Sequence, residues 1–343
     1  MQHAPIQPPD PDAVAAAREL SAGQAKPPGS LGVLEDLGAW IAGCQGACPP
    51  RPLDDVRVTV FAGDHGVTAS GVSAYPAAIT PAMVRAIAAG VAGISALATA
   101  NRVRVEVVDI AVAEDLADLD PAVARVKVCH GSAAIDVEDA LTDDQVDAAL
   151  RAGERLAAEA AADGAQLLIA GDLGIGNTTI AAALVAATFG LPATAVAGRG
   201  TGIDDATLAH KTAVIQRALL RVGPRAADPR QRLKALGSAD LAAGVGFMLG
   251  AARAGVPVLL DGLIAVAEAS VAASFDPGVL GWLRAGHRST EPGQSLALER
   301  LGLEPLLQAR MRLGEGTGAV LAVPIVRSAV AALRDIAQLS DLG

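Results

Sequence analysis

The sequence contains very few aromatic residues. Only 2% of its 343 residues are Phe, Trp or Tyr, whereas 52% are hydrophobic. The apolar content is therefore mainly Ala, Val, Leu and Ile, which build Ala-rich helices and aliphatic strands, and this composition excludes a disordered chain. The length suits one large domain with an appendage, or two domains.

Cysteines and basic clusters are also scarce. The three cysteines are Cys44, Cys48 and Cys129, an odd and sparse set that is typical of a reducing compartment. The Cys44–Cys48 spacing lacks further metal ligands nearby, so we interpret these residues as small apolar side chains near a helix end. The formal net charge is −10 and no basic cluster is present, which argues against a nucleic-acid partner.

No apolar run reaches about 20 residues without an Asp, Glu, Arg or Gly, which argues against a membrane span. The segment 241–260 comes closest and is better explained as a buried helix followed by a buried strand. The first residues, MQHAPIQPPDPD, have neither the cationic nor the apolar region of a secretory signal. We therefore expect a cytoplasmic protein without membrane contact.

Short β-branched runs alternate with helical patterns through the middle of the chain. Strands are predicted at 56–63, 103–112, 123–129, 165–171 and 256–262. Helices are predicted at 12–22, 31–45, 142–164, 178–190, 301–313 and 320–339, and directly after 262. This order predicts a three-layer α/β/α fold with a mostly parallel, Rossmann-like sheet. We expect a catalytic domain over 50–300 and a small helical lobe from 1–49 and 301–343.

Ligands of an open parallel sheet bind at the carboxyl ends of its strands, where two glycine-rich loops are expected. The first, GDLGIGNTT at 171–179, places glycines and free N–H groups at a helix start, which favours an anion. A tight turn with a helix cap explains that loop equally well. The second, AGRGTGIDD at 197–205, strengthens the anion interpretation. Neither a dinucleotide fingerprint nor a P-loop lysine fits the first loop, which disfavours a nicotinamide-dependent oxidoreductase.

A third glycine turn, MRLGEGTGA at 311–319, carries Glu315 between Gly314 and Gly316. An acid on such a turn is usually a solvated surface charge. The apolar residues on both sides favour instead a rigid turn pressed against a cleft, where burial would raise the pKa and suit proton abstraction.

These motifs, together with KPPGSLG, GDHGV, GVSAYP, LLDG and HRSTEPG, occur in an order that closely resembles the nicotinate-nucleotide–dimethylbenzimidazole phosphoribosyltransferase family over residues 20–335. The resemblance implies transfer of ribose phosphate from nicotinate mononucleotide to a benzimidazole in the assembly of cobalamin. It implies a homodimer, no metal and no cofactor. Asp64 and His65 are interpreted as hydrogen-bonded side chains of a strand-end turn.

The resemblance also implies roles for individual residues. Glu315 corresponds to the catalytic base. The substrate's ribose or base is assigned to Asp172, where the family usually has Glu, and to Asp261, Ser73 and Tyr75. The phosphate is assigned to Gly174, Gly176, Asn177, Thr178, Gly200, Gly202, Lys211 and Ser289.

Two departures bear on the accepting base. Pro81 and Ala82 stand where the family often has Gln, and Gln294 stands where it often has His. An enzyme that uses another acceptor, such as adenine, a phenolic compound or a different benzimidazole, is therefore the first alternative. A nucleotide-binding regulator without turnover is the second, and the intact Glu315 turn argues against it.

Overall fold

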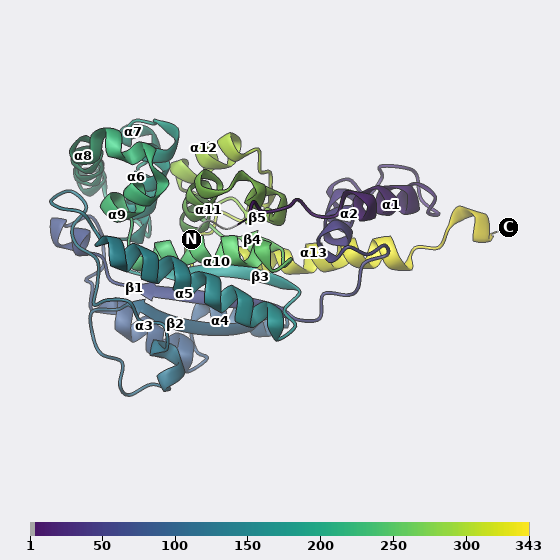
Figure 1. Ribbon diagram of the computed structural model, residues 1–343, viewed down its shortest axis with the longest axis horizontal. Helices are drawn as coiled ribbons and strands as arrows, with labels where there is room; N and C mark the ends of the chain where they lie inside the picture. Colours follow the sequence, from purple (N-terminus) through teal and green to yellow (C-terminus); the bar gives the residue numbers. More distant parts are fainter. Residues whose placement is uncertain (1–3, 343) are drawn as a thin grey trace.

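The computed structural model describes residues 4–342, which form a six-stranded parallel sheet in the order β2-β1-β3-β4-β5-β6 (Figure 1). The α/β class with a parallel sheet is thereby confirmed. The strands are β1 (Val56–Gly63), β2 (Arg104–Ala111), β3 (Leu167–Leu173), β4 (Val258–Leu260), β5 (Leu283–His287) and β6 (Pro305–Leu307).

Helices cover both faces of this sheet (Figure 1). In the described part of the chain they are α1 (Pro11–Ala22), α2 (Val33–Gln45), α3 (Ile79–Ala88), α4 (Gly93–Ala100), α5 (Asp143–Ala162), α6 (Asn177–Phe189), α7 (Ala193–Val196), α8 (Asp205–Val222), α9 (Pro229–Leu236), α10 (Ala239–Arg253), α11 (Leu263–Phe275), α12 (Pro292–Leu301) and α13 (Thr317–Asp335). Helix α10 crosses β1 and β3 with α5 outside it, and α11 lies beside α10. Helices α3, α4 and α13 lie on the other face. Every residue of β3 is buried, as expected for a strand covered on both sides.

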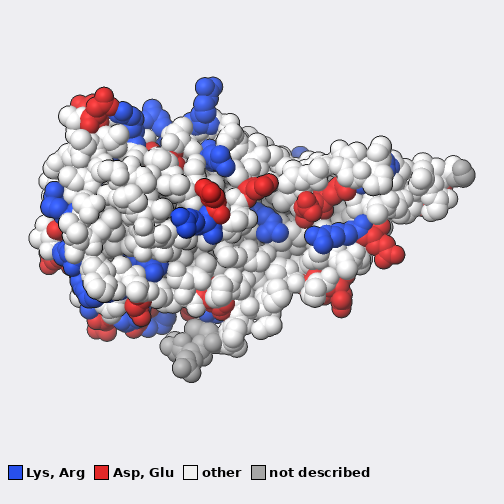
Figure 2. Space-filling model, turned by 90° about the horizontal axis from the view of Figure 1, so that it is seen from above, with Lys and Arg blue, Asp and Glu red and all other residues white. Residues whose placement is uncertain are grey.

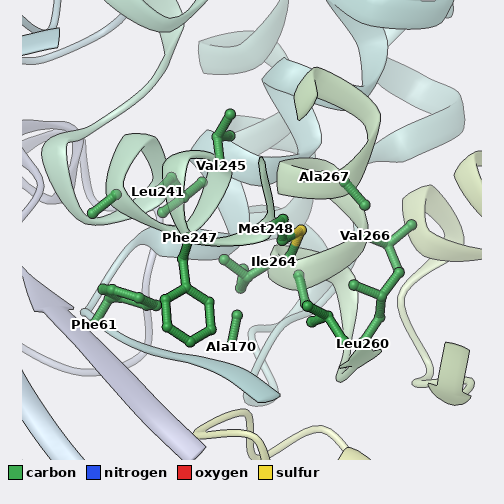
Figure 3. Close-up of a cluster of buried hydrophobic side chains, with 14 of the residues drawn as sticks. Phe61, Ala170, Leu241, Val245, Phe247, Met248, Leu260, Ile264, Val266 and Ala267 are labelled. Atoms are coloured by element: carbon green, nitrogen blue, oxygen red, sulfur yellow. The ribbon is translucent and has the colours of Figure 1, made fainter. Parts of the chain in front are cut away.

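The core between the sheet and α10 uses two of the four phenylalanines. Phe61 of β1 meets Phe247 of α10 edge to face, with ring centroids 5.3 Å apart (Figure 3). Met248 and Ile264 continue this cluster toward β4 (Figure 3). The segment 241–260 is thus a buried helix followed by a buried strand, as predicted.

Two predicted elements differ in the structure, and one strand was missed. Residues 123–129 form no strand, because Val128 and Cys129 only donate to the carbonyl of Ile110 at the sheet edge and no ladder results. The helix predicted at 301–313 is wrong: Gly302 ends α12 in the left-handed conformation, and Pro305 begins the edge strand β6, where its missing N–H costs nothing. Strand β5 was not predicted.

Helices α1 and α2 of the N-terminal region pack against the C-terminal half of α13 (Figure 1). A small cluster of Ala17, Ala39, Ala42 and Leu333 joins the three helices. Strand β6 is part of the sheet, and α13 packs on β5, β6 and β3. The domain boundaries at residues 50 and 300 remain a prediction, and residues 1–3 and 343 of the expected lobe lie outside the described range.

Charged side chains are spread over the surface in both signs, and the face in Figure 2 carries no large patch of one sign. Two helical stretches within residues 4–342 are long and apolar enough to cross a membrane by length and composition, Ile79–Ala100 and Thr317–Asp335. The first is divided into α3 and α4 by residues 89–92. The second is α13, which packs on the sheet and the lobe and contains Pro324 and Arg327. The buried core helix of a folded protein meets the same criteria of length and composition. The packing of α13 against the sheet and the lobe accounts for its apolar residues.

Candidate active site

The carboxyl ends of the strands enclose a cavity of about 100 Å³, walled by the first two glycine loops and the segment after GDHGV. Eight of the residues that the sequence indicated lie in its wall: Ser73, Asp172, Gly174, Gly176, Asn177, Thr178, Gly200 and Lys211. Leu313, two residues before Glu315, also lines it. Segments far apart in the sequence therefore meet at one cavity.

Besides Glu315, four other indicated residues lie outside this wall. Tyr75 is half exposed, and Gly202 packs against the Arg312 guanidinium. Ser289 donates from its N–H and hydroxyl to Gln294 Oε1 over 2.7 and 2.5 Å. Gln294, at a position where the family often has His, thus holds the HRSTEPG loop through these hydrogen bonds. The fourth, Asp261, holds the turn of Glu315, as described below.

The first glycine loop turns sharply into α6. Gly176 precedes the helix at φ +94°, a conformation that an L side chain rarely adopts. Asn177 then directs its Nδ2 to Asp172 Oδ1 over 2.6 Å. This loop presents the N-terminus of α6 to the cavity, which favours an anion there.

Lys211 of α8 links the two glycine loops. Its Nζ donates to Thr178 Oγ1 over 2.9 Å and to the carbonyl of Gly198 over 3.1 Å. Burial lowers the pKa of Lys211 to about 8, against the opposing charge of Glu291. The two loops and one buried cation therefore share a single anion-attracting corner.

Glu291, which sequence reasoning did not single out, closes this corner. Its Oε1 accepts from Gly200 N over 2.8 Å, and its Oε2 is buried without a hydrogen-bond partner among residues 4–342. A Cβ at Gly198 would collide with this carboxylate. The acid before Pro292 at the start of α12 was the only sequence signal.

The turn of Glu315 is held by Asp261, which follows β4. Asp261 Oδ2 accepts from Gly316 N over 3.2 Å, and Oδ1 accepts from Gly318 and Ala319 N over 2.7 and 3.1 Å. Both oxygens are therefore occupied by the backbone at the start of α13. Asp261 is placed to position the turn rather than to face the cavity.

Glu315 itself adopts φ +61°, which is strained for a non-glycine residue. Its side chain reaches the start of α4, where Oε2 accepts from Ile94 N over 3.0 Å, and its N–H donates to the Asp172 carbonyl over 3.3 Å. Burial raises the pKa of Glu315 above its usual 4.5, the Ile94 bond opposes this, and Asp261 adds to it. A buried carboxylate is thus held two residues along the chain from Leu313 in the cavity wall.

Asp172, which lines the cavity, belongs to a buried network of ionisable side chains. Burial and the neighbouring Asp240 carboxylate raise the pKa of Asp172 well above 3.8, against the opposing His65. Burial alone would lower the pKa of His65, but Asp240 outweighs it and raises that pKa to about 9. Asp240 is also fully buried, and His65 lowers its pKa. Asp240 was not recognised from the sequence.

His65 and Asp64 take the hydrogen-bonded roles that the sequence indicated for the strand-end turn. Asp64 Oδ2 accepts from Ala113 N over 2.9 Å. Within the described residues, no group of three or more His, Cys, Asp or Glu side chains is arranged to hold a metal ion.

A larger cavity, of about 500 Å³, lies elsewhere, between α13 and residues 52–54 and 100–102. It is remote from the glycine turns and carries none of the indicated residues. Cavity volume therefore does not identify the candidate site. The site is identified by the glycine-rich loops and buried acidic side chains that converge on the smaller cavity.

The fold and the site define a phosphoribosyltransferase of the parallel α/β type, and a family model described as phosphoribosyltransferase matches residues 6–343. The nicotinate-nucleotide–dimethylbenzimidazole phosphoribosyltransferase of Mycobacterium marinum is 53% identical over 340 residues, which are 99% of this chain and 94% of that one. The Mycobacterium tuberculosis protein of the same name is 52% identical, with the same coverage. CobT from Thermus thermophilus superposes with a TM-score of 0.92 at 42% identity, covering 97% of this chain and 99% of that one. The chain belongs to the nicotinate-nucleotide–dimethylbenzimidazole phosphoribosyltransferase family.

Proposed function

We propose that this enzyme transfers the ribose phosphate of nicotinate mononucleotide to 5,6-dimethylbenzimidazole or a related base, giving α-ribazole 5′-phosphate and nicotinate for cobalamin assembly. The observation that carries the proposal is Glu315, a buried carboxylate in a strained turn that Asp261 fixes beside the cavity. Family membership supports the choice of substrates.

The chemistry requires one base. The nicotinate leaving group is a pyridinium-type base that becomes neutral at its ring nitrogen as it departs, so no general acid is needed. The attacking benzimidazole nitrogen is a neutral lone pair, and the other ring nitrogen loses its proton as the bond forms. Glu315 takes that proton. Attack from the face opposite the leaving group inverts the anomeric carbon from β to α.

The substrate phosphate is assigned to the corner where the two glycine loops meet Lys211. The support is the N-terminus of α6, which no side chain caps, and the Lys211 bonds to both loops. Ser73 in the cavity wall and the exposed Tyr75 remain the proposed contacts of the ribose or base. Ser289 and Gly202 stay weaker phosphate candidates because they lie outside the wall.

The accepting base is the open part of the proposal. Pro81 offers no side-chain donor, and it lines a neighbouring cavity of about 360 Å³ rather than the one with Asp172. An apolar pocket discriminates one methyl group by only about 1–3 kcal/mol. We therefore expect several benzimidazoles to be accepted. We also propose a cytoplasmic homodimer, on the family resemblance alone.

The test is incubation with nicotinate mononucleotide and a panel of bases, namely dimethylbenzimidazole, benzimidazole, adenine and a phenol, followed by product mass and anomer analysis. The expected result is release of nicotinate and α-anomeric products with several benzimidazoles. Binding without nicotinate release would identify a regulator instead. A preference of many thousandfold for dimethylbenzimidazole over benzimidazole would contradict the apolar pocket.

A further inference from the structure

Two buried carboxylate oxygens near the first glycine loop lack a hydrogen-bond partner among the described residues. They are Asp172 Oδ2 and Asp240 Oδ1. The two carboxyl groups are within hydrogen-bonding reach of each other. Neighbouring buried carboxyl groups do not both ionise, and buried acceptors are normally paired. One missing hydrogen between them would satisfy both oxygens.

His65 determines which side of the network carries charge. Its Nδ1 lies 3.0 Å from the carbonyl of Ile175, which can only accept, so Nδ1 carries a hydrogen. Its Nε2 lies 2.9 Å from Asp240 Oδ2. A hydrogen on Nε2 as well makes the ring a cation paired with an ionised Asp240, in a position from which water is excluded.

We propose that Asp172 and Asp240 share one proton: Asp172 is protonated and its hydroxyl donates a hydrogen bond to the Asp240 carboxylate. His65 keeps Asp240 ionised. The ring nitrogens of His65 and the carboxyl oxygens of Asp172 and Asp240 are then all paired, and the buried Ser238 hydroxyl is a further group close to Asp240. Asn177 Nδ2 donates to Asp172 Oδ1, the Asp172 hydroxyl donates to Asp240 Oδ1, and the two His65 nitrogens donate to Asp240 Oδ2 and to Ile175 O. The group of three ionisable side chains carries no net charge. His65 and Asp240 are positioning residues.

The sequence makes room for this network with glycine. A Cβ at Gly63 would collide with the Asp240 carboxylate, and one at Gly174 would collide with the His65 ring. Gly174 therefore serves the packing of His65 as well as the loop. The network is hydrogen-bonded to the first glycine loop at Ile175 and at Asn177. The protonation state of the network therefore also affects the conformation of that loop.

This inference deepens the proposed function, and its kinetic part rests on it. A neutral Asp172 in the cavity wall does not repel the substrate phosphate that the same wall is proposed to bind. It also leaves Glu315 as the general base of the site. The other buried acid near this network, Glu268 of α11, does not line the cavity wall.

The protonation itself is tested by infrared difference spectroscopy, without any substrate. At pH 7, a C=O stretch of a protonated carboxylic acid should be present in the wild type and absent in Asp172→Asn. The exposed Glu299→Gln variant is the control and should show only loss of carboxylate bands. Loss of carboxylate bands alone in Asp172→Asn would overturn the proposal.

Asp240→Asn tests the shared proton. The amide that this substitution introduces would accept from His65 through its carbonyl and donate from its NH₂ group to Asp172, so Asp172 no longer needs a proton and ionises. The carboxylic-acid band of Asp172 should therefore vanish in Asp240→Asn, and its persistence would contradict the sharing. If this buried variant does not fold, the Asp172→Asn spectrum decides alone.

The kinetic consequence is a split between binding and chemistry. In Asp240→Asn the KM for nicotinate mononucleotide should rise several-fold, because an ionised Asp172 repels the phosphate, and the Asp172→Asn/Asp240→Asn double variant should restore it. A merely structural role of Asp240 would leave the double variant as defective as the single one, which would overturn the proposed charge relation. If the spectra support the shared proton but KM never changes, the protonation stands and the phosphate assignment of the proposed function fails.

Discussion

The Glu315 turn and the Asp172 loop each place a carboxyl group in the site, but their surroundings favour opposite protonation states. Glu315 and Asp172 are both buried, and their backbones are hydrogen-bonded to each other. Glu315 Oε2 faces a backbone N–H at the start of α4, which favours the ionised form, whereas Asp172 faces the Asp240 carboxylate, which favours the neutral form. The neighbouring group therefore distinguishes a base from a neutral wall residue.

The bracing of the two turns differs in the same sense. Asp261 holds the Glu315 turn through three backbone N–H groups, so Glu315 is free to accept a proton. Asp172 is instead committed to Asn177 and the His65–Asp240 pair. A carboxylate whose oxygens are committed to a network is a poor base, whatever its distance from the substrate.

The largest expected effect is that of Glu315→Gln. This variant keeps the size of the side chain and should still bind both substrates, but the transfer step should slow by about 100-fold or more, the usual contribution of a positioned base. The defect should shrink at high pH, where benzimidazole loses its proton more readily. Calorimetric binding and single-turnover rates on the same preparation measure both quantities.

If Glu315 only braces its turn, Glu315→Gln would lose binding or fold poorly while its transfer step stayed near normal. A well-folded variant with near-normal turnover would remove Glu315 from the mechanism and would make Asp172 the next candidate.

Lys211→Ala should act on binding instead of chemistry. We expect the KM for nicotinate mononucleotide to rise about tenfold to a hundredfold, as loss of a charge-assisted bond of roughly 1.5–3 kcal/mol implies, with little change in the transfer step. Lys211→Met, which fills the same space without charge, should behave alike. An unchanged KM in both variants would end the phosphate assignment.

The pH dependence of substrate capture follows from the same residue. Burial lowers the pKa of Lys211 to about 8, so the free enzyme loses this cation as pH rises through that value. The wild-type kcat/KM for nicotinate mononucleotide should therefore fall above about pH 8, and this alkaline decline should be absent in Lys211→Met.

A smaller effect is expected from Glu268, the buried acid of α11. Burial, and then the charges of Asp240 and Asp261, raise its pKa well above 4.5, so the folded protein binds a proton that the unfolded chain releases. Stability is consequently lost as pH rises above the unfolded pKa. Glu268→Gln should raise Tm at neutral pH, by about 1–2 °C for each kcal/mol gained in a chain of this length.

That gain should disappear near pH 4, where Glu268 is largely neutral in both states. The exposed Glu299→Gln variant is the matched control and should leave Tm unchanged at either pH. A lower Tm for Glu268→Gln at pH 7 would show that Glu268 has an ionised partner in the folded protein.

Much of this comparison was predictable from the sequence because the signals are local. The strands β1 to β4 and the helix caps follow from periodicity and from residues such as Thr142, which caps α5 as predicted. The Glu315 turn was recognised by its flanking glycines. The partners that set protonation were not, because Asp240 lies 175 residues from His65 and belongs to an ordinary apolar helix pattern. The backbone partners of Asp261 were not predictable for the same reason, since only the fold shows that its oxygens meet the start of α13.

The measurement that tests the account most directly is the pH dependence of the single-turnover transfer rate in wild type, Asp172→Asn and Glu315→Gln. In wild type the rate should fall as pH is lowered through the pKa of Glu315, which burial places above 4.5. Asp172→Asn should keep this acidic decline and lose far less than the roughly 100-fold of a positioned base, whereas Glu315→Gln should be slow and show no such decline. An acidic decline that disappears in Asp172→Asn and persists in Glu315→Gln would contradict the assignment and make Asp172 the base.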